Sequence, residues 1–126
     1  MKKIALLAAC AALTATPVLA DTAAELNIAQ NHAGMAAKAA DLKTTQMHLH
    51  HAVNCLVGPK DGDFDKTNTN PCAQLGNGAF PDESNQEIKT KLQNALSAAF
   101  DGIASNDEAT AKKNAATVKT ILEAIK

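Results

Sequence analysis

The chain has 126 residues, enough for one domain with a modest core, and its 13 acidic residues nearly balance its 12 basic residues. Every basic residue is a lysine, and the chain has no tryptophan and no tyrosine. It therefore lacks the guanidinium forks and most of the stacking surfaces that bind nucleic acid, and we expect no nucleic-acid partner.

The first twenty residues have the pattern of an export signal. A basic start is followed by an apolar stretch over Ile4–Leu13 and by small residues that end at Ala20. The pattern predicts a signal peptide over residues 1–20 that is cleaved after Ala20. The alternative is a lipoprotein signal in which Cys10 becomes the lipidated first residue, but its apolar stretch would be only about four residues, shorter than export signals use.

Cleavage at this point leaves residues 21–126 as a single helical domain in the periplasm or outside the cell. This part carries ten lysines against thirteen acidic residues, a formal charge of −3. No later stretch of about 18 apolar residues follows, so we expect no membrane association after cleavage.

Residues 22–57 have the composition of a helix, with no proline and one glycine, Gly34. Apolar or uncharged residues recur in alternating steps of four and three. They are Ile28, His32, Met35, Ala39, Leu42, Gln46, Leu49, Val53 and Leu56. Because no phase change or turn residue interrupts this rhythm at Lys43–Thr45, we predict one continuous helix over residues 22–57, near 50 Å long. A bent or split first helix is the alternative.

Gly58 and Pro59 end this helix, and turn-forming residues predict an irregular loop over residues 58–81. Cys55 and Cys72 flank the first part of the loop. In an exported protein such a pair predicts a disulfide, which should contribute about 3 kcal/mol by closing the loop.

The two cysteines have an alternative use. Together with His48 and His51 they would form a tetrahedral zinc site with two cysteine and two histidine ligands. A disulfide and thiolate ligands exclude each other, and the oxidising compartment favours the disulfide.

Two further helices are predicted over residues 84–102 and 106–125. Each begins at a capping box, Ser84–Glu87 and Ser105–Glu108, and carries an apolar stripe at helical spacing. The fold class is therefore all-α: a three-helix bundle with one long N-terminal helix and a disulfide-tethered loop, or four helices if the first is split. Because the two shorter helices cannot cover the long one, part of its apolar seam would be free for a homodimer.

Three of the four histidines lie close together near the end of the predicted first helix. His48 and His51 are three residues apart, so their imidazoles point the same way on a helix and can hold one ion between them. Met47 and His50 form a neighbouring pair, and a thioether ligand adds a preference for copper. The alternative is that the histidines simply cap the helix's free carbonyl groups.

Other candidate ligands are less well placed. Asp61, Asp63 and Asp65 alternate as in a calcium loop, but the glycine and glutamate positions of that loop do not match, so we expect a solvated turn. The disulfide would hold these acids near the histidines, where one carboxylate could complete an ion's shell or neutralise a protonated imidazole. On one continuous helix, His32 and Met35 would lie about 24 Å from the histidine cluster. They would then be a separate weak site, axial ligands of a haem, or core residues.

No catalytic motif is present, and we expect no enzymatic activity. The histidines and methionines of residues 21–55 resemble those of the small periplasmic metal-binding helical bundle proteins of bacteria, which sequester copper, nickel or zinc. This resemblance implies an exported bundle that binds one transition metal ion through Met47, His48, His50 and His51, with copper preferred and zinc or nickel as alternatives. The competing hypothesis is a structural or protein-interaction module without metal.

Overall fold

The computed structural model describes residues 20–125, so the predicted signal peptide, apart from Ala20, lies outside the described residues. This part of the chain contains five helices and no strand. They are α1 (Thr22–Ala37), α2 (Leu42–Val57), α3 (Ala79–Asp82), α4 (Gln86–Ala104) and α5 (Glu108–Glu123). The all-α class is confirmed, although the helix count exceeds both the three and the four that were predicted. Within residues 20–125, none of the helices combines the length and the apolar character needed to cross a membrane.

The predicted continuous helix over residues 22–57 is wrong. α1 ends at Ala37, the chain turns over Lys38–Asp41, and α2 starts at Leu42. Asp41 is the N-cap of α2: its Oδ1 accepts a hydrogen bond from the backbone N–H of Thr44 at 2.7 Å. The apolar rhythm does not follow the core on α1: the buried residues there are Glu25, Ala29, Ala33 and Ala36, whereas Met35 is exposed, so the unbroken rhythm did not reveal the break.

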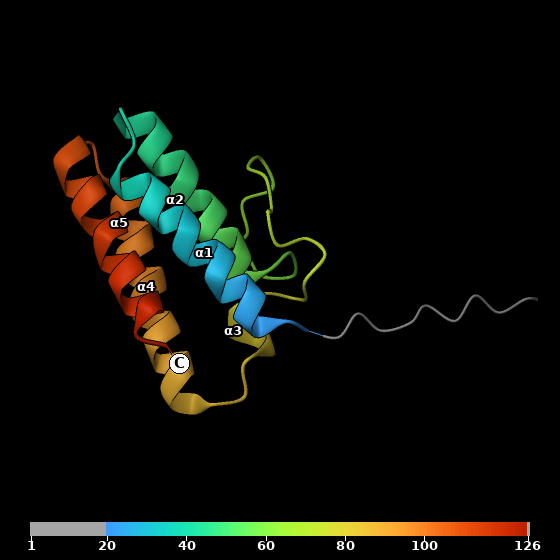
Figure 1. Ribbon diagram of the computed structural model, residues 1–126. Helices are drawn as coiled ribbons and strands as arrows, with labels where there is room; N and C mark the ends of the chain where they lie inside the picture. The colour runs from blue at the N-terminus through green and yellow to red at the C-terminus, as the bar shows by residue number, and fades with distance from the viewer. Residues whose placement is uncertain (1–19, 126) are drawn as a thin grey trace, which may run out of the picture.

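The four long helices form an up-and-down bundle (Figure 1). α1 packs against α2 and α5, and α4 packs against α5 and α2. Fully buried alanines lie where helices meet, including Ala29 and Ala33 on α1 and Ala115 on α5, while Leu49 and Leu92 fill the wider parts of the core. The apolar face of α1 is thus covered within one chain. A homodimer through the first helix stays a prediction.

The two predicted C-terminal helices agree with α4 and α5 to within two residues at each end. The predicted capping residues are wrong. α4 is capped by Asn85, whose side-chain oxygen accepts hydrogen bonds from two backbone N–H groups of the first turn, and α5 is capped by Asp107. In both helices the N-cap is the polar residue directly before the first helical residue, and the serine that was predicted as the cap lies further upstream.

The predicted disulfide is confirmed: Cys55 and Cys72 are bonded, with a Cα–Cα distance of 5.2 Å. The loop is also held by Asn54, which is fully buried on α2. Its amide nitrogen donates to the Asp65 carbonyl oxygen at 2.9 Å, and its side-chain oxygen accepts from the Asp65 N–H at 2.9 Å. The disulfide and Asn54 together fix the loop against the end of α2.

The predicted irregular loop contains one short helix, α3, which follows two glycines in close contact. Gly58 and Gly78 both have positive φ, at 74° and 111°. A Cβ on Gly78 would lie 2.5 Å from the Gly58 nitrogen, so only glycine allows the two backbone segments to approach this closely.

Glu25 of α1 is a fully buried acid at the same end of the bundle. Its Oε1 accepts a hydrogen bond from the Gly78 N–H at 3.0 Å, whereas its Oε2 has no partner among the described residues. Burial raises the pKa of the Glu25 carboxyl, the Gly78 hydrogen bond opposes the shift, and the nearby acids Asp82 and Asp21 add to it. Protonation of Glu25 is therefore more favourable in the folded state than in the unfolded chain.

Candidate metal centre

Three histidines from two helices converge on one point between α1 and α2. His32 lies on α1, and His48 and His51 lie one turn apart on α2. Because the chain reverses over Lys38–Asp41, His32 is brought level with the other two. One potential ligand nitrogen from each ring lies within 4.8 Å of the others. In the described part of the chain, no other group of three or more histidine, cysteine or acidic residues could hold an ion.

The ring geometry suits a metal ion. The Nδ1 atoms of His32 and His48 are 3.3 Å apart. A tetrahedral ion with metal–nitrogen distances of about 2.0–2.1 Å separates its ligand nitrogens by about 3.3–3.4 Å, so these two nitrogens already have the required spacing. His51 meets the other two rings nearly edge-on, with interplanar angles of 85° and 79°. One of its ring nitrogens lies within 4.8 Å of a nitrogen of each of the other two rings.

The environment favours the neutral form of two of these imidazoles, His32 and His51. Burial, followed by the charges of His51 and His48, lowers the pKa of His32 to about 4. Burial is also the largest cause that lowers the pKa of His51, with His48 and His50 next. Neutral imidazole is the form that binds metal, so at neutral pH these two rings need not lose a proton first.

One of the three histidines also carries an unsatisfied ring nitrogen. Nδ1 of His51 is buried and has no hydrogen-bond partner among the described residues. Leaving a buried ring nitrogen without a partner costs free energy, and such atoms in native structures call for an explanation such as a bound ion or water. A metal ion between the three rings would supply the missing partner.

The structure brings together only part of the ligand set that was predicted from the sequence. His48 and His51 meet as expected, but their partner is His32, which the continuous-helix prediction had placed about 24 Å away. His50 and Met47 do not join this group. The signal that could have found His32 is Asp41, an N-cap residue with no apolar role in the middle of the supposed helix.

His50 instead pairs with the loop. Its Nδ1 lies 3.0 Å from Oδ2 of Asp65, which confirms that one loop carboxylate reaches a histidine. Side-chain hydrogen bonds from Thr67 and Asn68, then the Thr67 backbone N–H, hold the pKa of Asp65 down to about 2, with His50 a smaller contributor. Asp65 is therefore an ionised, fixed acceptor for the His50 ring.

The other candidate ligands do not form sites in the described residues. Cys55 and Cys72 are joined to each other and so cannot be the thiolates of a zinc site. Asp61 caps its own turn, since its Oδ1 accepts from the Asp63 N–H at 2.8 Å. Met35 is 43 % exposed, so it is not the core residue that was considered.

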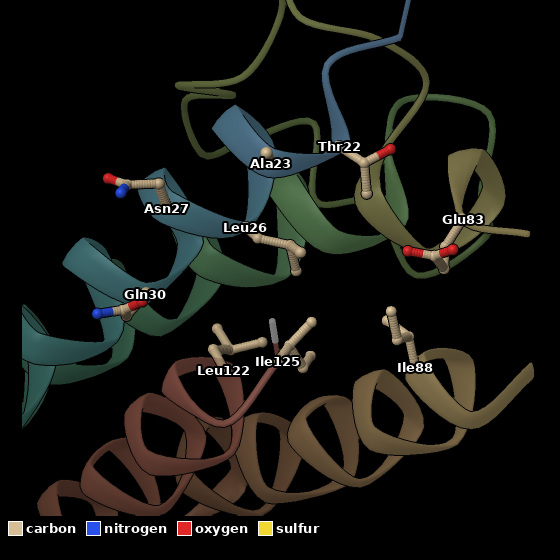
Figure 2. Close-up of a pocket in the computed structure, with 9 residues that line it drawn as sticks. All are labelled: Thr22, Ala23, Leu26, Asn27, Gln30, Glu83, Ile88, Leu122 and Ile125. Carbon is tan, nitrogen blue, oxygen red and sulfur yellow. The ribbon is translucent and has the colours of Figure 1, made fainter. Parts of the chain in front are cut away.

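A separate apolar groove lies at the opposite edge of α1. Leu26, Ile88, Leu122 and Ile125 point into one space between α1, the start of α4 and the end of α5 (Figure 2), with a cavity volume of about 470 Å³. Its only acidic lining residue is Glu83, and it includes none of the histidines. The groove therefore has no ligand set for a metal ion.

The fold and the site define a small helical bundle with a candidate three-histidine metal centre between its first two long helices. No protein-family model matches the chain, and neither a curated protein nor a solved structure matches it.

Proposed function

We propose that the chain is an exported helical protein that binds one transition metal ion through His32, His48 and His51. The observation that carries this proposal is the convergence of three imidazoles from two helices, with two ring nitrogens 3.3 Å apart. A hydrogen bond between His32 and His48 would account for that one distance. It would leave the buried Nδ1 of His51 without a partner.

The ligand set guides the choice of ion. Imidazole suits copper, zinc and nickel, and among divalent ions of the first transition row copper binds most tightly to a given nitrogen site. We therefore propose copper as the preferred ion, with zinc and nickel as alternatives. The site is assigned to metal retention, and the absence of enzymatic activity stays a prediction.

Export is part of the same proposal. The disulfide between Cys55 and Cys72 is of the kind that persists in oxidising compartments, and the first twenty residues have the composition of a signal peptide. We propose the periplasm or the extracellular space as the location. The structural or interaction-module hypothesis has no observation in its favour that singles it out.

The test is a competition titration of tag-free protein with copper(II), zinc(II) and nickel(II). We expect one tight equivalent for the parent and loss of that equivalent in the variants H32A, H48A and H51A. H50A is the matched control, because His50 lies on the same helix but outside the three-histidine group. Tight binding that survives in H32A, or a parent chain that binds none of the three ions, would overturn the proposal.

A further inference from the structure

His50 and Met47 are left out of the three-histidine centre, and the structure places them together elsewhere. They lie three residues apart on α2, where side chains of an α-helix are neighbours. Both line an open cavity of about 570 Å³, with Thr44 and Gln46 of α2 and Asn68 of the loop. The cavity lining includes none of His32, His48 and His51.

The pairing of His50 with Asp65 fixes how the ring is presented. Nδ1 lies 3.0 Å from Oδ2 of Asp65, and in the neutral ring that donates this hydrogen bond Nε2 carries the lone pair. Asp65 itself is held by Asn54 through its backbone and by Thr67 and Asn68 through its carboxylate. A histidine that donates one ring nitrogen to a fixed carboxylate is the arrangement that orients metal-binding histidines in proteins.

Met47 supplies a second, soft ligand beside this ring. Met47 is 38 % exposed, so its side chain is accessible from solvent. A thioether next to an imidazole selects copper(I) over zinc, because soft sulfur ligands favour the softer ion.

We propose that Nε2 of His50 and the thioether of Met47 form a second metal site, separate from the three-histidine centre, that takes copper(I). A thioether ligand selects copper(I), whereas zinc takes a tetrahedral shell of which these two side chains supply only half. The proposal does not depend on the three-histidine centre being occupied.

The test is a copper(I) titration of tag-free protein without oxygen, with ascorbate as the reductant so that the disulfide stays intact, and with a chromophoric copper(I) chelator as competitor. We expect M47L and H50A each to bind one equivalent fewer than the parent. M35L is the matched control, since Met35 on α1 is exposed to a similar degree, 43 % against 38 % for Met47, and it should lose none. Zinc titrations of the parent and of M47L should be identical.

A second readout identifies the atom. In nitrogen-15 spectra, copper(I) should shift Nε2 of His50 and leave its Nδ1 protonated, as the bond to Asp65 requires. Unchanged copper(I) stoichiometry in both M47L and H50A, or a shift at Nδ1 in place of Nε2, would overturn the second site. Failure of the three-histidine centre is distinguishable, because it would appear as unchanged binding in H32A.

Discussion

An ion held by His32, His48 and His51 would join α1 to α2, so metal should stabilise the folded chain. A ligand that binds only the native state at a free concentration of 100 times its Kd stabilises that state by about 2.7 kcal/mol. For a domain slightly larger than 100 residues, each kcal/mol raises Tm by about 4 °C, so we expect a rise of about 10 °C on adding zinc. Zinc avoids the redox chemistry of copper in this assay.

His32→Ala is the informative change, because it leaves two histidines on α2 alone and removes the link to α1. We expect the zinc-induced rise in Tm of this variant to be nearly abolished. Each variant is compared with its own metal-free form, so that any change in Tm caused by the loss of the imidazole's packing cancels. The assay is thermal unfolding followed by circular dichroism, with His50→Ala as the control that keeps the full rise. An undiminished rise in His32→Ala would refute the assignment of His32 as a ligand, and no rise in the parent would refute the stabilising link.

Three further predictions concern the scaffold. Replacing Cys55 and Cys72 by serine should lower the free energy of unfolding by about 3 kcal/mol in urea titrations, because the unfolded chain regains the freedom of an open loop. Gly78→Ala should destabilise by about 1–3 kcal/mol, since its φ of 111° and its contact with Gly58 leave no room for a Cβ, whereas Gly62→Ala, which meets open space, should stay within about 0.5 kcal/mol of the parent. The stability of Glu25→Gln relative to the parent should increase as pH rises above 4.5. Because the pKa of Glu25 is raised by folding, its carboxyl contributes fully to the parent's free energy of unfolding at low pH, and this contribution is lost as the buried carboxyl ionises.

Each of these has a result that would count against it. A double serine variant as stable as the parent would mean that Asn54 alone holds the loop. Equal effects of alanine at Gly78 and Gly62 would contradict the close contact of the two backbone segments. For Glu25→Gln, the difference from the parent should change with pH between 4.5 and 7.5, and a constant difference would show that burial does not shift the titration of this carboxyl.

The sequence predicted best what depends on local chemistry. α4 and α5 were placed to within two residues because apolar spacing and a polar N-terminal stretch are local signals, and the disulfide followed from export and an even cysteine pair. The break between α1 and α2 was missed because its apolar rhythm runs through Lys38–Asp41 without a change of phase. Only the capping side chain of Asp41 marked it.

The candidate site was only half predictable for the same reason. His48 and His51 follow from helical spacing, but His32 joins them only after the chain reverses, which is a tertiary event. The position of Asp65 beside His50 depends on the buried amide of Asn54, which holds an irregular loop in place. Asp65 follows Asn54 by 11 positions and His50 by 15, and no spacing rule predicts contacts at such separations across an irregular loop. The contact between His50 and Asp65 could therefore not be predicted from the sequence.

The central claim is that three imidazoles from two helices hold one ion. X-ray absorption at the edge of the bound metal measures this directly in tag-free protein loaded with one equivalent of zinc. The proposed centre predicts three imidazole nitrogens at about 2.0–2.1 Å in the parent and two in His32→Ala. A parent spectrum with one imidazole or none, or a spectrum unchanged by His32→Ala, would contradict it.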